Sequence, residues 1–183
     1  FVTLVCDPVD YPRVLDEIRA GGVTAQMRRL QASKGFALTS GYDAVTADYI
    51  SRLEDHGTSP LYLKAYPSQK LRYGENPHQS AALYAWNEGD GALGGNLLQG
   101  KELSYNNLLD LDAAWRAVLS FDKPTICIVK HLSPCGIASA TELVTAFHSA
   151  LASDPVSAFG AVIAANVPFD GLTAEALGEL FVE

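Results

Sequence analysis

The run Thr125-Ile126-Cys127-Ile128-Val129 decides the fold of this chain. All five residues are apolar or β-branched, and such a continuous run is typical of a strand that is covered on both faces of a sheet. Apolar residues at helical spacing lie on either side of it, from Leu108 to Leu119 and from Leu143 to Leu151. The alternation of strand and helix predicts an α/β fold with a layered sheet.

Weaker patterns extend this arrangement in both directions. Towards the C-terminus we expect a strand over 161–165 and a helix after Thr173, and Thr141 is expected to cap the helix that precedes them. Between the N-terminal part and the helix at Leu108, the sequence predicts strands over 81–86 and 97–103, separated by a glycine-rich loop.

Residues 1–55 contain only a strand and two or three helices. The sequence predicts a strand over 1–6, a helix from Asp10 to Gly21-Gly22, and a second helical stretch from Thr24 to Leu53 that Gly35 and Gly41 interrupt. These elements are too few to make a domain alone. Both ends of the chain also lie within apolar runs, so we expect the numbering to cover a piece of a longer protein.

The helical pattern fades between His56 and Leu71. Pro60 and Pro67 fall in this stretch, and alternating tyrosines suggest an extended crossing segment. We place the domain boundary here, which divides the chain into residues 1–58 and residues 59–183.

Charge and cysteine content exclude several classes of protein. Thirteen Lys and Arg against twenty-one Asp and Glu give a net charge of −8, and residues 131–183 contain no Lys or Arg. A chain this acidic is a poor candidate for general nucleic-acid binding, which depends on the neutralisation of many phosphates. No apolar run approaches the roughly 20 residues that span a bilayer, no leader marks the chain for secretion, and Cys6, Cys127 and Cys135 have no metal-type spacing. We expect a cytoplasmic protein with no nucleic-acid or membrane partner.

Polar residues gather in four segments, and the first two precede the helix at Leu108. The first segment runs from Arg72 to Gln79, where turn residues bring side chains together and a guanidinium is available for a phosphate or carboxylate. Its alternative interpretation is a solvated turn. The second segment runs from Lys101 to Asn107. It either caps the helix or offers the helix N-terminus to an anion.

The third and fourth segments follow the predicted central strand. Lys130-His131 ends that strand, where a lysine is costly to bury unless it is paired or contacts an anion, and a neutral imidazole can act as a general base. A strand end that simply reaches solvent is the alternative. The fourth segment, residues 153–160, has a turn at Asp154-Pro155 and an aromatic ring beside open backbone at Phe159-Gly160.

A metal site is not expected. His131 and Cys135 invite comparison with zinc deaminases, whose signature requires H-x-E and P-C-x-x-C. Leu132-Ser133 follows the histidine here, and Ala138 stands where the second cysteine would be. A nucleophilic role for Cys135, four residues from His131, is conceivable but has no other support.

In content, order and spacing, the four segments resemble the AICAR transformylase/IMP cyclohydrolase family, and the resemblance covers essentially the whole chain. It implies that residues 59–183 are the first half of the transformylase domain, with a layered sheet similar to that of cytidine deaminases but without zinc. It also implies that residues 1–58 are the end of the cyclohydrolase domain, which has a methylglyoxal-synthase-like fold, plus a linker.

The resemblance also implies an activity. In this family a formyl group passes from 10-formyltetrahydrofolate to AICAR, which gives FAICAR, and the full-length protein then closes FAICAR to IMP. His131 would take the proton from the attacking amine, and Lys130 would stabilise charge in the transition state. The residues that the resemblance assigns to substrate binding are Arg72, Tyr73, Asn107, Phe159 and Gly160.

The family's active site lies across a homodimer interface, so the resemblance implies that Arg72, Tyr73 and Asn107 complete the partner subunit's site. The front half of the cyclohydrolase and the second half of the transformylase fall outside these 183 residues. The piece alone is therefore not expected to complete either site. The alternative hypothesis is a non-catalytic module that binds a nucleotide or dimerises without turnover.

Overall fold

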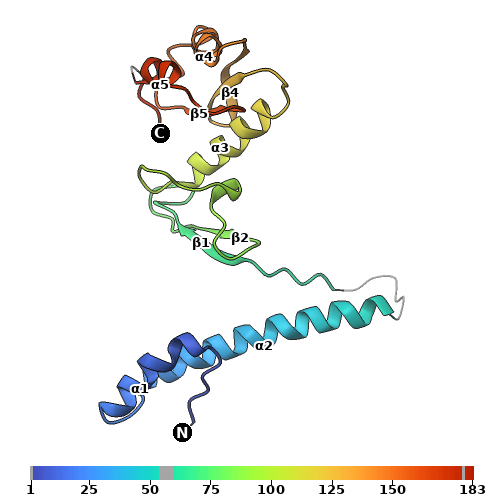
Figure 1. Ribbon diagram of the computed structural model, residues 1–183, viewed down its shortest axis with the longest axis vertical. Coiled ribbons are helices and arrows are strands. Elements are labelled where there is room, and N and C mark those ends of the chain that lie inside the picture. Colours follow the sequence, from blue (N-terminus) through green and yellow to red (C-terminus); the bar gives the residue numbers. More distant parts are fainter. Residues whose placement is uncertain (1, 54–59, 179) are drawn as a thin grey trace. The chain divides into compact units, whose positions relative to one another are not determined.

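A computed structural model describes residues 2–53, 60–178 and 180–183. The chain divides into two units, residues 1–64 and 65–183, and contains helices together with small antiparallel sheets (Figure 1). The first unit contains η1 (Pro8–Asp10), α1 (Tyr11–Arg19) and α2 (Ala25–Leu53). The second contains β1 (Tyr66–Lys70), β2 (Ala82–Ala85), η2 (Ala92–Gly94), α3 (Tyr105–Val118), β3 (Thr125–Lys130), β4 (Ser133–Ser139), α4 (Leu143–Leu151), β5 (Val162–Ala165) and α5 (Gly171–Leu177).

Side-chain hydrogen bonds and glycine residues determine where the short helices of the first unit begin and end. The Asp7 carboxylate accepts the Val9 N–H at 3.0 Å and starts η1. Asp10 occupies the N-cap position of α1 as predicted, but its side chain makes no capping bond, because its carboxylate pairs with the Lys34 ammonium at 2.6 Å. Gly21 and Gly22, with φ of 114° and 136°, end α1 as predicted, since the left-handed region favours glycine.

The predicted interruption of α2 is wrong. Thr24 caps the helix as predicted, with its hydroxyl accepting the Met27 N–H at 3.1 Å, but α2 then continues through Gly35 and Gly41 to Leu53. A glycine inside a helix costs only about 1 kcal/mol relative to alanine, which is too little to end a long helix. A Cβ on Gly35 would lie 3.0 Å from the Leu4 side chain, so the missing methyl group makes room for Leu4.

Two predicted strands do not form. Residues 2–6 pair with no strand, and the described part of the first unit contains no strand that could partner them; Phe1 lies outside the described residues, as does the predicted boundary between 58 and 59. Residues 97–103 also form no strand, and Leu97 and Leu98 are exposed. Strand backbone groups need hydrogen-bonding partners, and apolar content alone does not supply them.

The second unit begins with an antiparallel hairpin of β1 and β2, in which Tyr66 lies opposite Ala85 and Lys70 opposite Ala82. The strand predicted over 81–86 is confirmed as β2. The sequence did not predict β1, where Pro67 weakens a strand pattern because it lacks the backbone N–H. A register shift between Pro67 and Gln69 accommodates the proline.

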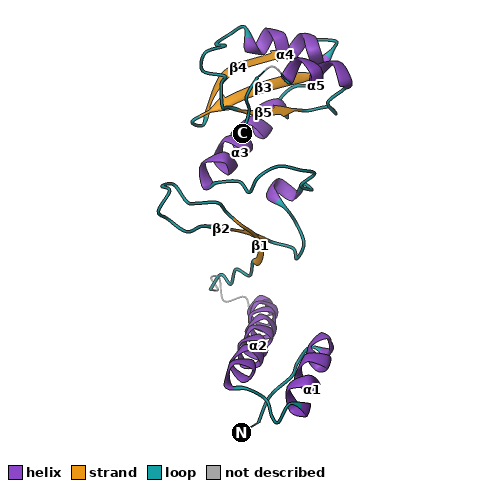
Figure 2. Ribbon diagram, turned by 90° about the vertical axis from the view of Figure 1, so that its left-hand side faces the viewer, coloured by secondary structure: helices purple, strands orange, loops and turns teal. Residues whose placement is uncertain are grey.

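The predicted central strand is confirmed as β3. It lies between β4 and β5, and both pairings are antiparallel. Alternate side chains point to opposite faces. Ile126 and Ile128 pack in the cluster that contains Phe147 of α4, whereas Cys127 and Val129 pack against α3. Figure 2 shows this layering, with α4 on one face of the sheet and α3 on the other.

The helices of the second unit largely match the predicted positions. Ser104 caps α3 with a capping box. Helix α5 begins at Gly171, three residues before the predicted start after Thr173, because Asp170 caps it by accepting the Thr173 N–H at 2.8 Å. The predicted cap at Thr141 is wrong, since Glu142 occupies that position without a side-chain bond. Among the described residues, the helices are too short or too polar to cross a membrane.

Candidate functional site

The turn between β3 and β4 is unusually constrained. Lys130 lies opposite Ser133, so His131 and Leu132 alone connect the two strands. Their φ angles are 54° and 65°, and positive φ at both central residues is what a type I′ hairpin turn requires. For residues other than glycine, such a conformation costs about 1–3 kcal/mol, and backbone strain of this kind is concentrated at functional sites. The strained turn therefore makes His131 a candidate functional residue.

A pocket of about 390 Å³ lies beside this turn, and we call it the hairpin pocket. It is lined by Lys130, His131, Pro134, Cys135, Asp154 and Ser157. The structure thus brings the third polar segment of the sequence against the fourth. His131 is exposed, so its imidazole is accessible to a ligand in this pocket.

The Lys130 ammonium donates a hydrogen bond to the carbonyl oxygen of Phe159 at 2.7 Å. A neutral carbonyl holds the side chain in place without cancelling its charge. No ion pair between described residues involves Lys130. Its positive charge is therefore available to an anion or to a developing oxyanion in the hairpin pocket.

The other titratable groups of the hairpin pocket argue against thiol chemistry. Burial raises the pKa of the Cys135 thiol, and the nearby Asp154 carboxylate acts in the same direction. Hydrogen bonds from Ser157 lower the pKa of Asp154, whose Oδ1 accepts the Ser157 N–H at 3.0 Å. Nucleophilic cysteines need a lowered pKa, so the conceivable role of Cys135 as a nucleophile loses support. Among the residues that the structure describes, no cluster of three or more His, Cys, Asp and Glu could hold a metal.

Cys135 is positioned by an irregularity in the hairpin. Ile128 lies opposite Gly136 and Val129 opposite Pro134, so Cys135 is an extra residue in β4. Bulges of this kind re-aim side chains and are common next to active sites. The adjacent Gly136 has no room for a side chain, because a Cβ there would overlap the carbonyl group of Ala150 in α4.

The first and second polar segments meet in what we call the Arg72 cluster, which consists of Arg72, Tyr73, Asn107 and Glu183. The Arg72 guanidinium lies 3.3 Å from Asn107 Oδ1 and 3.4 Å from Glu183 Oε2, with its carbon 5.1 Å from the centre of the Tyr73 ring. The sequence did not predict the part played by Glu183, since nothing in the local pattern connects residues 111 positions apart.

Local hydrogen bonds build this cluster. Asn107 Oδ1 accepts the Ser104 N–H at 2.9 Å, and the Ser104 hydroxyl accepts the Asn107 N–H at 3.2 Å. The alternative interpretation of the second segment, helix capping, is therefore what these two residues do in the structure. The main chain reinforces the contact, because Tyr105 N–H donates to the Tyr73 carbonyl at 3.1 Å. Asn107 thus both caps α3 and contacts Arg72.

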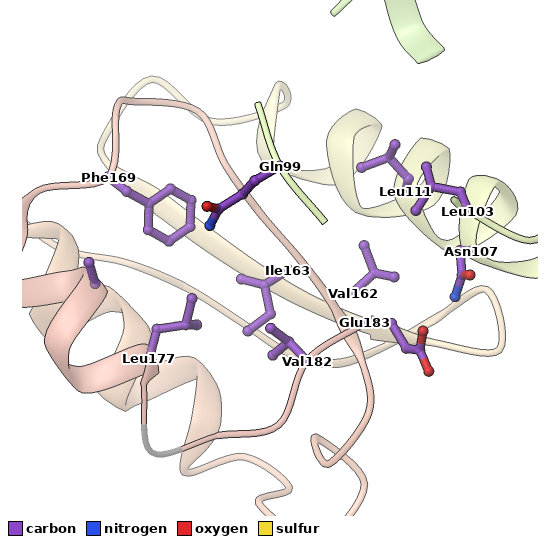
Figure 3. A pocket seen from close by; sticks show the side chains of 11 residues that line it. Gln99, Leu103, Asn107, Leu111, Val162, Ile163, Phe169, Leu177, Val182 and Glu183 are labelled. Carbon is purple, nitrogen blue, oxygen red and sulfur yellow. The ribbon is translucent and has the colours of Figure 1, made fainter. Parts of the chain in front are cut away.

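A second, larger pocket of about 580 Å³ opens beside the Arg72 cluster. Its walls are mostly apolar side chains from α3, β5 and α5, among them Leu111, Ile163 and Leu177. Figure 3 shows Asn107 and Glu183 on one side of this pocket, with Phe169 and Leu177 on the other. The pocket combines an apolar wall with a polar edge.

The predicted site residues therefore fall into two groups. Arg72, Tyr73 and Asn107 form one, whereas Lys130 and His131 belong to the other, and no described residue lines both pockets. Of the predicted pair Phe159 and Gly160, Phe159 contacts the second group through its backbone carbonyl, which accepts a hydrogen bond from Lys130. The Phe159 ring packs on Phe181 with 5.3 Å between centroids, and Gly160 N–H donates to the Phe181 carbonyl at 2.8 Å.

Comparisons with known proteins agree with one another. The sequence model of the AICARFT/IMPCHase bienzyme family matches residues 1–183. A "Bifunctional purine biosynthesis protein PurH" from Acidithiobacillus ferrooxidans is 47% identical over 189 residues, and proteins of the same name from Parvibaculum lavamentivorans and Thermosynechococcus vestitus are each 45% identical. Each match covers 100% of this chain but only 36%, 35% and 37% of the respective relative. The chain thus spans about a third of their length.

Proposed function

Because the chain belongs to the AICARFT/IMPCHase bienzyme family, we propose that it carries part of the catalytic machinery of purine biosynthesis. The proposed reaction is transfer of the formyl group of 10-formyltetrahydrofolate to the amino group of AICAR, which gives FAICAR. Closure of FAICAR to IMP is the proposed second activity of the whole protein, as the word bifunctional in the relatives' name suggests. We propose the cytoplasm as its location.

The observation that carries the proposal is that Lys130 and His131 both line the hairpin pocket. The amine of AICAR is a weak nucleophile, because its lone pair is delocalised into the imidazole ring. It needs a base to take its proton as it attacks the formyl carbon. We assign that role to the imidazole of His131. The carbon–nitrogen bond to the folate then breaks, and the tetrahydrofolate nitrogen is protonated.

Lys130 has a complementary role in this proposal. Attack on the formyl carbon converts its carbonyl oxygen into an oxyanion, which a preorganised positive charge stabilises. The ammonium is preorganised by its bond to the Phe159 carbonyl and is not neutralised by a carboxylate of the described chain. Both features favour charge stabilisation in the transition state over a purely structural role.

We assign the Arg72 cluster to nucleotide binding. Arg72 offers a guanidinium to the phosphate or carboxamide, Tyr73 supports it, and Asn107 presents an amide. A bound anion would compete with Glu183 for the guanidinium. The Phe159-Gly160 pair is proposed to line the pocket of the base.

A homodimer is part of the proposal. The two groups of residues line different pockets, and we propose that the Arg72 cluster of one chain serves the hairpin pocket of the other. For the architecture, we propose a cytidine-deaminase-like sheet in residues 59–183 and the end of a methylglyoxal-synthase-like domain in residues 1–58.

The test is a paired assay on the full gene product that carries these residues. His131→Ala is expected to abolish formyl transfer while cyclisation of supplied FAICAR continues. His148→Ala, at an exposed position of α4, is the matched control and should retain both activities. Equal loss of both activities in a folded His131→Ala variant would overturn the assignment.

A further inference from the structure

We infer that Asp110 is a positioning residue, whose carboxylate holds the hairpin turn in the geometry that presents His131 to the substrate. This inference rests on the proposed function, in which His131 is the base. The observation behind it is a single hydrogen bond, in which the Leu132 N–H donates to Asp110 Oδ1 at 2.7 Å.

The Leu132 N–H needs a partner from outside the hairpin. In a two-residue turn the ladder pairs Lys130 with Ser133, and the usual turn bond goes to the last of the four residues. The N–H of the third residue, Leu132, then has no acceptor within the hairpin. Asp110 supplies an acceptor for it from a different element, 22 positions earlier in the sequence. A charged acceptor also makes this bond stronger than one between neutral groups.

Helix α3 gives the carboxylate a rigid base. Asp110, Ala114 and Val118 follow one another at a spacing of four, which places them along one side of the helix. Ala114 and Val118 are fully buried and pack against Cys127 and Val129 of β3. The side of α3 that packs on β3 therefore also carries Asp110, one helical turn before Ala114. From there the Asp110 carboxylate reaches the hairpin turn at the end of β3.

The backbone conformation of the turn is strained, and the hydrogen bond to Asp110 helps to maintain it. His131 and Leu132 both hold positive φ without being glycine, asparagine or aspartate, so their intrinsic preference is to leave this conformation. Leu132 is also half-exposed and gains little packing in return. Without the Asp110 acceptor, we expect the turn to relax and the His131 imidazole to move away from its position in the lining of the hairpin pocket.

The charge of Asp110 also reaches the hairpin pocket, since it contributes to raising the pKa of Cys135 together with Asp154. Asp112, on the same helix, faces elsewhere and pairs with Arg116 at 2.9 Å. Asp112 therefore provides a matched control of identical chemistry, two positions away.

The test measures formyl transfer by the full gene product and three variants. Asp110→Ala should lower kcat by about 10- to 100-fold, because small displacements of a catalytic group have effects of this size, while the KM for AICAR changes by less than about threefold. Asp110→Asn, whose side-chain oxygen still accepts the N–H, should stay within about threefold of wild type in kcat. Asp112→Ala should behave like wild type.

A suppressor sharpens the test. Leu132→Gly removes the cost of positive φ at this position, so it should recover part of the kcat lost in Asp110→Ala, although it restores no hydrogen bond. If Asp110 contributed only to folding, adding Leu132→Gly to Asp110→Ala could not raise kcat without also raising the melting temperature of the protein. Wild-type kcat in Asp110→Ala, or equal loss in Asp110→Asn and Asp110→Ala, would overturn the inference.

Hydrogen exchange on the wild-type protein provides a readout that requires no variant to fold. The Leu132 amide should be protected although it lies in an exposed turn, and exchange at the rate of an unstructured peptide would overturn the inference. This readout also separates the two proposals. Absence of formyl transfer by the wild-type protein would refute the proposed function, whereas an active protein with an unprotected Leu132 amide would refute only the role of Asp110.

Discussion

The Lys130 ammonium lies 2.7 Å from the carbonyl oxygen of Phe159 and joins the end of the central strand to the loop that precedes β5. The contact fixes the position of a cation without neutralising it. In the proposed reaction, the same ammonium stabilises the oxyanion that forms on the formyl group.

Removal of this cation should therefore affect one activity of the full protein and spare the other. Lys130→Ala is expected to lower the kcat of formyl transfer by about 10²- to 10³-fold, the range seen when one oxyanion-stabilising group is lost. Cyclisation of supplied FAICAR should be unchanged. Lys123→Ala, at an exposed position just before β3, is the control. A Lys130→Ala protein that transfers formyl groups at the wild-type rate would remove Lys130 from the mechanism.

The proposed two-subunit site can be tested by mixing two variants, each of which is defective at an AICAR concentration well below the wild-type KM. Arg72→Ala should weaken AICAR binding by about 10- to 100-fold, because it removes a charged hydrogen-bonding partner. If Arg72 of one subunit serves His131 of the other, co-folded Arg72→Ala and His131→Ala chains should regain about a quarter of wild-type formyl transfer, since half of the dimers contain one intact site. A mixture as inactive as its components would show that both residues act within one subunit.

The close approach of β4 and α4 makes a stability prediction. Gly136→Ala would drive a methyl group into the Ala150 carbonyl, so we expect a loss of about 1–3 kcal/mol or more in the free energy of unfolding. Gly171→Ala is the matched control, because nothing lies within 4 Å of a Cβ at that position. Urea denaturation of both variants measures the difference, and equal midpoints would contradict the packing described here.

Cysteine reactivity should depend on pH in a defined direction. Burial raises the pKa of Cys127 to about 11 and also raises the pKa of Cys135. Only the thiolate reacts with iodoacetamide, so both thiols should be alkylated slowly at neutral pH, and Cys127 should gain reactivity only as pH approaches 11. Peptide mass spectrometry provides the rates, with the urea-unfolded chain as reference. Native Cys127 that reacts at pH 8 as fast as the unfolded chain would contradict its burial.

The limits of sequence reasoning follow from particular residues. The run over 125–129 predicted the central strand because every residue in it is suited to burial on both faces. The strand β4 was not predicted, since Ser133-Pro134 resembles a turn and the real turn uses His131 and Leu132, neither of which is a usual turn residue. Gly35 and Gly41 suggested breaks in α2 because glycine weakens a helix locally, whereas the whole helix tolerates both.

Side-chain convergence was only partly predictable as well. Local motifs pointed to Lys130, His131 and Arg72, because their chemistry is unusual where they occur. The acceptor role of Asp110 and the ion pair of Glu183 depend on contacts across 22 and 111 positions. No spacing rule connects residues so far apart, and only the packing of α3 against β3 brings Asp110 to the turn.

The central claim, that the imidazole of His131 takes the proton from the AICAR amine, is tested most directly by chemical rescue. The measurement is the rate of formyl transfer by the full-length His131→Ala protein as imidazole is added to the assay. We expect the rate to rise with imidazole concentration and to saturate, with no such rise for Lys130→Ala. A His131→Ala protein that already transfers formyl groups at the wild-type rate, without any imidazole, would contradict the claim.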